Sequence, residues 1–248
     1  MNGSPLLETR GLTMRFGGVT AVAGADFSLG AGELRCLIGP NGAGKSTFFK
    51  CLTGQLRPTE GEILFDGASL VGEEPHAIAR RGISIKTQVP SLFDGLSVAE
   101  NLRLAAARTR NRTETRAAVE EIVRLVGLAD RADSVASQLP HGQRQWLELG
   151  LVLACDPRLM LLDEPTAGMT KQEVARTAEI IREIGRDRAM IVVEHDMQFI
   201  QMIAHRVTVF HQGRILAEDT MDNILANEEV RDVYLGKQAG ARRERDDA

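Results

Sequence analysis

The stretch that decides the fold is Gly39-Pro40-Asn41-Gly42-Ala43-Gly44-Lys45-Ser46. It matches the phosphate-binding pattern GxxxxGK[ST], in which glycines let backbone N–H groups wrap around phosphate oxygens and the next helix presents its positive end. The pattern assigns the β and γ phosphates to Lys45, Mg²⁺ to the hydroxyl of Ser46 and support of the α phosphate to Thr47. Residues 34–38 read as a strand before it, and a helix is expected to begin around Lys45. A glycine-rich turn that precedes a helix by chance is the alternative, and it fits this context poorly.

A second chemical motif follows another apolar run. Residues 159–162 are Leu-Met-Leu-Leu, and Asp163 and Glu164 come directly after them. This order places two carboxylates at the carboxyl edge of a predicted strand, where ligands bind to parallel sheets. Beside a phosphate loop, Asp163 can complete the Mg²⁺ environment and Glu164 can polarise the attacking water. A solvated strand end is the alternative for the two acids.

Alternating strands and helices predict the fold class. Residues 159–162 and 189–193 are continuous apolar runs, separated by a helix that Thr170 and Glu173 would cap. Such alternation predicts an α/β fold with a parallel sheet. The opening of the chain reads as β-rich, and residues 97–127 read as helices. We therefore expect a parallel α/β sheet, preceded by strands and turns and interrupted by a helical insertion.

Composition limits the function. The 248 residues are 43% hydrophobic and carry a formal net charge of −4, so no basic excess indicates nucleic-acid binding. Residues 1–10 do not resemble a secretory signal, and every apolar run is far short of the roughly 20 residues that cross a bilayer. Three cysteines without CxxC spacing are expected to be reduced, buried thiols of a cytoplasmic protein.

The ordered motifs resemble the nucleotide-binding subunit of ATP-binding-cassette (ABC) transporters, over about residues 7–235. Five further segments match positions that this family uses: Phe16 as the adenine platform, Gln88 as the glutamine loop, Pro140, His141, Gly142 and Gln143 in the signature, Ala167-Gly168-Met169 as the loop after the second acid, and His195 as the switch histidine. Each is weak alone, and their order carries the resemblance.

The resemblance implies the α/β, P-loop NTPase fold of ABC ATPases, which has a mixed sheet core with an antiparallel β subdomain and a helical insertion. It also implies ATP and Mg²⁺ as cofactors. One domain is expected over residues 1–237, with a helical subdomain at about 90–158 and a disordered tail at 238–248. Catalysis is assigned to Glu164, His195 and Gln88. The ATP-binding set comprises Phe16, Gly39, Pro40, Asn41, Gly42, Ala43, Gly44, Lys45, Ser46 and Thr47, and the metal set comprises Ser46, Gln88 and Asp163.

The family's mechanism also implies partners. Two ATPase copies, identical or paralogous, would pack head to tail, with the signature of one acting in trans on the ATP of the other. Membrane permease subunits would hold the dimer at the inner face of the cell membrane, and a periplasmic or extracellular solute-binding protein would act indirectly. No nucleic-acid partner is expected.

Several details resemble the branch that imports branched-chain amino acids, urea and short amides, and the signature with Trp146 is most similar to the urea arm. In place of the usual Leu-Ser-Gly-Gly-Gln, this signature carries Pro140 and His141. Proline removes a hydroxyl and an N–H donor. Either His141 donates a hydrogen bond to the opposite γ phosphate, or it only packs at the interface.

Other classes of cassette ATPase stay open. An assembly ATPase, such as one for iron-sulphur clusters, is the main alternative, although no acidic residue follows Gln143 as in many of those proteins. A chromosomal or repair ATPase would need long coiled coils between Lys45 and Asp163, for which there is no room. A repeated-cassette translation factor would need two copies of the motifs.

Overall fold

The computed structural model describes residues 4–87 and 92–233 of the chain. The chain divides into two compact units. The first comprises residues 1–75 and 193–248, and the second comprises residues 76–192.

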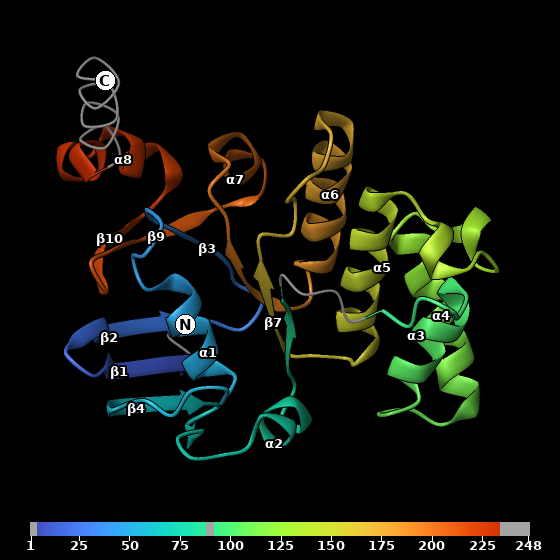
Figure 1. Cartoon of the computed structure of the whole chain (residues 1–248), viewed down its shortest axis with the longest axis horizontal. Coiled ribbons are helices and arrows are strands. Elements are labelled where there is room, and N and C mark those ends of the chain that lie inside the picture. The colour runs from blue at the N-terminus through green and yellow to red at the C-terminus, as the bar shows by residue number, and fades with distance from the viewer. Residues whose placement is uncertain (1–3, 88–91, 234–248) are drawn as a thin grey trace. The chain divides into compact units, whose positions relative to one another are not determined.

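The first unit contains an antiparallel sheet and part of a mixed sheet (Figure 1). The antiparallel strands run in the order β2-β1-β4-β5, with bounds Val19–Leu29, Leu7–Phe16, Glu60–Phe65 and Ala68–Ser69. In the mixed sheet, β3 (Leu34–Ile38) pairs parallel with β9 (Arg206–His211), which pairs antiparallel with β10 (Arg214–Asp219). The helices of this unit include α1 (Lys45–Leu52), α7 (Met197–Ile203) and α8 (Met221–Ala226), and residues 228–233 are helical as well. The β-rich opening is therefore confirmed.

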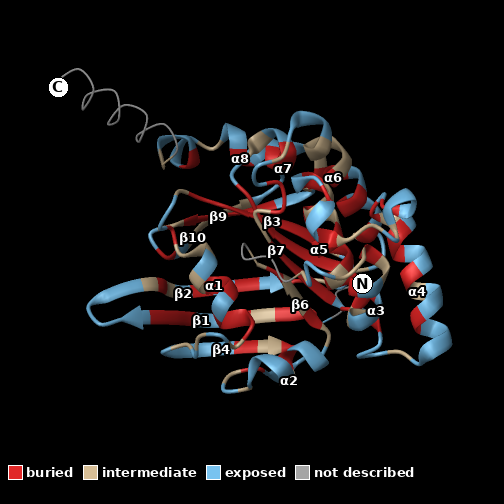
Figure 2. Ribbon diagram, turned by 45° about the vertical axis from the view of Figure 1, so that its right-hand side comes forward, coloured by how far each residue is buried: buried red, intermediate tan, exposed pale blue. Residues whose placement is uncertain are grey.

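Burial explains how α1 is held in this unit. All five residues of β3 are buried, as the red strand in Figure 2 shows. Phe48 of α1 lies between two aromatic rings, with centroids 5.6 Å from Phe27 and 5.2 Å from Phe210. These contacts hold α1, the helix that begins at the phosphate loop, against β2, which carries Phe27, and β9, which carries Phe210.

The second unit combines short parallel strands with most of the helices. β6 (Ile83–Lys86) pairs parallel with β7 (Leu159–Asp163), and β7 lies between β6 and β8 (Ala189–Val193) in the strand order. Its helical segments are α2 (Pro75–Arg80), α3 (Val98–Ala106), α4 (Arg112–Leu125), η1 (Ala129–Arg131), η2 (Ala136–Gln138), α5 (His141–Ala154) and α6 (Lys171–Ile184). The predicted α/β class with parallel strands is confirmed.

The predicted helix starts are also confirmed. Capping boxes open α3 at Ser97, α4 at Asn111 and α6 at Thr170, each with a glutamate three residues later. The expected limits of the helical subdomain, about 90–158, and of the whole domain, 1–237, stay predictions. The tail at 238–248 lies outside the described residues.

Within the described residues, no helix has the length and apolar character to cross a bilayer. The thiols of Cys36 and Cys51 are buried, and Cys155 is half-buried. Burial raises the pKa of Cys51 to about 11 and raises that of Cys36 still further. These two thiols therefore stay protonated at neutral pH, as expected for structural cysteines.

Candidate nucleotide site

The phosphate loop connects β3 to α1 in the first unit. Gly39 and Gly44 have φ of 149° and 105°, in the region that favours glycine. A Cβ at Gly39 would overlap the carbonyl oxygen of Phe210, and one at Gly44 would overlap that of Ala21. Side chains are therefore excluded at both ends of the loop, which leaves its backbone free to surround a ligand.

Lys45 lies over its own loop. Its Nζ donates to the carbonyl oxygens of Gly39, at 2.7 Å, and Pro40, at 3.1 Å. A further hydrogen bond anchors the loop: the N–H of Gly213 donates to the carbonyl oxygen of Ala43 at 2.9 Å. No acidic residue lies in the first turn of α1, so the positive end of the helix dipole is not offset. A cation and a helix N-terminus thus meet at one loop, as phosphate binding requires.

The exposed polar positions of the loop are also suited to a ligand. Asn41, Gly42 and Ser46 are exposed, and Thr47 is half-buried. The hydroxyl of Ser46 therefore lies at a surface that a bound nucleotide could reach.

Phe16 ends β1 in the same unit. Its side chain is 46% exposed, which is unusual for a phenylalanine. The turn that follows it leads into β2, whose Ala21 contacts the loop at Gly44. Phe16 thus presents an exposed aromatic ring just before the strand that contacts the phosphate loop. An adenine base needs such a ring to stack on.

His195 belongs to the first unit and comes two residues after the end of β8. Its side chain is 69% exposed, whereas that of Glu194 beside it is 1% exposed. The next residue, Asp196, caps α7 by accepting from the N–H groups of Gln198 and Phe199. The buried residue on one side and the cap on the other fix the backbone of His195, while its imidazole reaches outward.

Asp163 and Glu164 lie in the second unit at the carboxyl end of β7. Lys86 pairs with Leu162, so β6 and β7 end at the same edge of the sheet. Glu164 has φ of 46°, in the left-handed region that non-glycine residues seldom adopt. Such backbone often occurs at functional sites, but Asp66, Asp156 and Gln212 adopt it as well, so the role of Glu164 stays a prediction.

The signature begins α5, with Pro140 as its N-cap and His141 as its first residue. Nε2 of His141 lies 2.9 Å from the carbonyl oxygen of Ala167. The adjacent Gly168 has φ of 74°, and a Cβ there would be 2.9 Å from the same nitrogen. A Cβ at Gly142 would overlap the carboxylate of Glu173. The structure therefore brings the signature and the loop after Glu164 together within one chain.

Two contacts of α5 were missed by sequence reasoning. Trp146 donates from Nε1 to Oγ1 of Thr177 at 2.9 Å, which joins α5 to α6. Nζ of Lys86 lies 3.3 Å from Oε2 of Glu148, and both side chains are almost fully buried. Lys86 ends a short strand that is mostly apolar, and Glu148 is the single charged residue in the apolar second half of α5, residues 146–154; this is the sequence signal that could have revealed the pair.

Gln88 lies outside the described residues, so its assignment stays a prediction. Within the described residues, no group of three or more His, Cys, Asp or Glu could hold a metal ion. The assignment of Mg²⁺ to Ser46 and Asp163 stays a prediction; a hydroxyl and a carboxylate are oxygen ligands of the kind that Mg²⁺ binds.

The model of the ABC transporter family matches residues 22–167. The chain belongs to this family: it is an ATP-binding subunit and an ATPase. The predicted family and activity are thereby confirmed.

Relatives of known name extend over nearly the whole chain. The high-affinity branched-chain amino acid transport ATP-binding protein BraF of Pseudomonas aeruginosa is 36% identical, with 94% of this chain and 98% of BraF covered. The ribose import ATP-binding protein RbsA 1 of Rubrobacter xylanophilus is 38% identical, with 88% of this chain but only 45% of RbsA 1 covered.

Solved structures agree on the fold. MJ1267, an ATP-binding cassette of an ABC transporter, superposes with a TM-score of 0.85 at 25% identity, covering 94% of this chain and 99% of MJ1267. CbiO1 from Clostridium perfringens, part of the ABC transporter complex cbiONQ, superposes with a TM-score of 0.83 at 27% identity, covering 98% of this chain and all of CbiO1. The predicted P-loop ABC ATPase fold is confirmed.

Proposed function

We propose that this chain hydrolyses ATP to power an importer of branched-chain amino acids, urea or short amides. The observation that carries the proposal is the full-length likeness to BraF and to LivG of Escherichia coli, both named as branched-chain amino acid transport ATP-binding proteins. The ribose relative supports it less, because this chain spans under half of that protein. The urea arm rests on the signature with His141 and Trp146.

The two units would contribute different parts of the chemistry. In this proposal Lys45 neutralises the β and γ phosphates, and Ser46 and Asp163 hold Mg²⁺, which offsets charge on the phosphate oxygens when bound. Glu164 polarises the attacking water and His195 contacts the γ phosphate. Gln88 would complete the metal and water environment.

The proposal also includes the assembly. Two ATPase copies, identical or paralogous, would bind ATP between the phosphate loop of one and Pro140, His141, Gly142 and Gln143 of the other. Permease subunits would hold the pair at the inner face of the membrane, and a solute-binding protein would deliver the cargo. Closure on ATP and reopening after hydrolysis would drive transport.

Glu164→Gln tests the mechanism. The amide keeps the shape of the side chain but removes the carboxylate, so hydrolysis is expected to fall by about 10² to 10⁴-fold while ATP binding survives. The variant is expected to accumulate as a dimer in ATP, read out by size-exclusion chromatography with and without nucleotide. Glu183→Gln, at an exposed position of the same unit, is the matched control. Wild-type turnover in Glu164→Gln removes this residue as the base, and a monomer in saturating ATP with permeases present removes the dimer.

Uptake by whole cells tests the cargo. Deleting the gene is expected to abolish uptake of labelled leucine, urea or acetamide, while uptake of labelled ribose continues. Restoring the wild-type gene, but not the Glu164→Gln gene, should restore the lost uptake. Persistent uptake of leucine, urea and acetamide together with failing iron-sulphur enzymes would instead support an assembly ATPase.

A further inference from the structure

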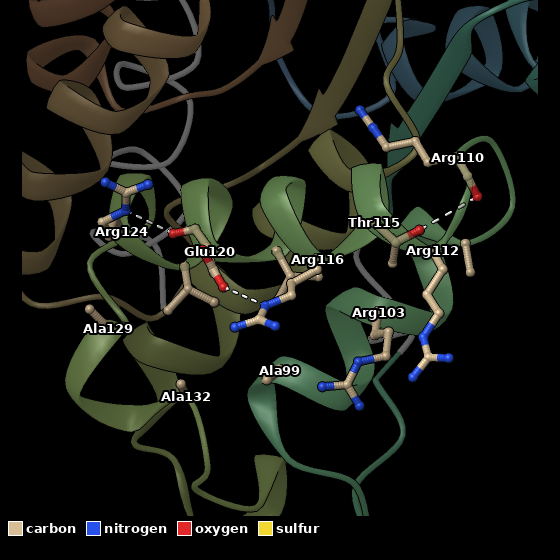
Figure 3. A pocket seen from close by; sticks show the side chains of 13 residues that line it. Ala99, Arg103, Arg110, Arg112, Thr115, Arg116, Glu120, Arg124, Ala129 and Ala132 are labelled. Atoms are coloured by element: carbon tan, nitrogen blue, oxygen red, sulfur yellow. Dashed lines mark hydrogen bonds and ion pairs between the residues drawn. The ribbon is translucent and has the colours of Figure 1, made fainter.

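A wide groove in the second unit lies between α3 and α4 and is closed at one end by η1 (Figure 3). Its volume is about 1120 Å³, above the roughly 300–1,000 Å³ typical of small-molecule sites. Positively charged residues dominate its lining, which contains five arginines and a single acid, Glu120. This contrasts with the chain as a whole, whose net charge is −4.

Only part of this positive charge is neutralised inside the molecule. Nε of Arg116 donates to Oε1 of Glu120 at 3.0 Å, and Nη2 of Arg110 lies 3.2 Å from Oδ1 of Asp156. Nε of Arg124 donates only to the backbone oxygen of Glu120, at 2.9 Å.

Two arginines of the groove have a different environment. Arg103 and Arg112 are exposed and form no salt bridge with any residue of the described ranges 4–87 and 92–233. The carboxylate of Glu100, on the same helix as Arg103, offsets part of the charge of Arg103, whereas Arg112 has no such neighbour among the described residues. In Figure 3 their guanidinium groups point toward the same end of the groove. Like charges gathered in this way repel one another, and an anionic ligand would relieve that repulsion.

The floor of the groove is apolar and made of small side chains. Val119 and Val123 of α4 are buried in it, and four alanines contribute to the lining: Ala99, Ala107, Ala129 and Ala132. Alanines let another backbone approach closely, so the floor suits a helix that presents an apolar stripe. No aromatic side chain is among the lining residues, so the groove lacks the aromatic platform on which nucleic-acid bases usually stack.

We propose that the groove binds an acidic amphipathic helix of a partner protein. The apolar stripe of that helix would lie on the alanine and valine floor. Its Asp or Glu side chains would pair with Arg103 and Arg112, which can hold a carboxylate with two hydrogen bonds each. None of the residues that line the groove belongs to the phosphate loop, the signature or the acids at the end of β7, and the proposal does not depend on the cargo.

A designed peptide tests the proposal on the full-length protein. The probe is a labelled helix of about 16 residues, roughly four turns, with glutamates on one face and leucine and alanine on the other. Fluorescence anisotropy is expected to show binding at about 0.05 M salt that weakens at 0.3 M. A lysine version of the same peptide should not bind.

Paired variants locate the binding. Arg103→Glu with Arg112→Glu is expected to weaken the affinity by at least about tenfold. Arg80→Glu with Arg182→Glu makes the same charge change at exposed positions of the same unit outside the groove, and should stay close to wild type. Because all four side chains are exposed, the variants should keep the wild-type melting temperature. The double variant Arg103→Gln with Arg112→Gln removes the two positive charges without reversing them, and provides a second measurement with a smaller charge change.

Three results overturn the proposal. The first is equal binding of the acidic peptide by the double variant Arg103→Glu with Arg112→Glu and by the control, Arg80→Glu with Arg182→Glu. The second is equal binding of the lysine peptide. The third is groove-dependent binding of anionic phospholipid vesicles or of a single-stranded oligonucleotide in preference to the peptide, which would assign the arginines to a membrane or to nucleic acid.

A different observation concerns His141. Its Nε2 contacts the carbonyl of Ala167, although the two residues belong to separate sequence motifs. His141 also interacts with Glu173 near the start of α6. Hydrogen bonds from Thr170 hold the pKa of Glu173 below its ordinary value, and the nearby His141 lowers this pKa further. His141 thus lies between the loop after Glu164 and the start of α6.

We infer that His141 is a positioning residue, which fixes the loop after Glu164 to the signature of its own chain. This inference rests on the proposed function, and it differs from the hydrogen bond to the opposite γ phosphate that the sequence also allowed. In this role the histidine sets the geometry around the proposed base. It therefore affects the rate of hydrolysis more than the affinity for ATP.

Graded substitutions separate the two roles. The amide of His141→Gln can reach the position of Nε2 and should retain most activity, whereas His141→Asn and His141→Ala cannot and should lower kcat with little change in KM. Hydrogen exchange gives a readout independent of catalysis, because the amides of Ala167 and Met169 form turns with Glu164 and Thr166. Their exchange in His141→Ala is expected to rise by about tenfold.

The outcomes keep the two claims apart. Unchanged exchange in the loop, or full turnover of His141→Ala while Glu164→Gln is inactive, overturns the positioning role but leaves the proposed function intact. A raised KM for ATP without altered exchange assigns His141 to the opposite nucleotide instead. Wild-type turnover in Glu164→Gln removes Glu164 as the base. The proposed function itself fails only if uptake of leucine, urea and acetamide persists after the gene is deleted.

Discussion

The buried ion pair between Lys86 and Glu148 allows a stability prediction with a definite size. Lys86 ends β6 and Glu148 lies on α5, and their side chains are 3% and 4% exposed. Oε2 of Glu148 faces the ammonium at 3.3 Å, whereas Oε1 has no hydrogen-bond partner among the described residues. Lys86→Met fills similar space but leaves a buried carboxylate without its cation.

Removing one partner of a buried ion pair usually costs about 3–5 kcal/mol of the free energy of unfolding. For a chain of this length, each kcal/mol corresponds to about 2–4 °C, so Lys86→Met should melt roughly 6 to 20 °C below wild type. Trp146 is the chain's single tryptophan and lies on the same helix as Glu148. Its intrinsic fluorescence therefore reports the unfolding of α5 in urea or heat.

Two controls complete the experiment. Lys171→Met removes an exposed lysine of the same unit and should change stability by less than about 0.5 kcal/mol. The double variant Lys86→Met with Glu148→Leu removes both charges and should recover most of the loss, because an apolar pair avoids the cost of buried charge. A free energy of unfolding of Lys86→Met within about 1 kcal/mol of wild type would refute this reasoning.

Two further predictions concern single sites. Lys45→Ala should abolish productive ATP binding, because the loop loses its side-chain cation; wild-type turnover would remove the phosphate-loop assignment. Thr170→Ala should lower the free energy of unfolding by about 0.5–2 kcal/mol, since Oγ1 caps α6 by accepting from the N–H of Glu173. Thr170→Ser keeps the hydroxyl and should stay near wild type, and an equal loss in both variants would exclude the cap as the cause.

Local features of this protein could be predicted from the sequence alone. The glycine pattern at residues 39–46 and the helix starts at Ser97, Asn111 and Thr170 each depend on neighbours within a few positions. Buried strands could be recognised because they are continuous apolar runs between turn signals. The chemical roles followed from residue type and order, and a resemblance to a known family joined them into one site.

Tertiary structure alone decided which distant residues meet. The contact of His141 with Ala167, the pairing of Lys86 with Glu148 and the groove around Arg103 and Arg112 depend on how helices and strands pack. No local pattern specifies such contacts, because the same helix can pack in several rotations and registers at similar local energy. Side-chain packing in the folded chain selects one of them, and that selection determined what these residues contact.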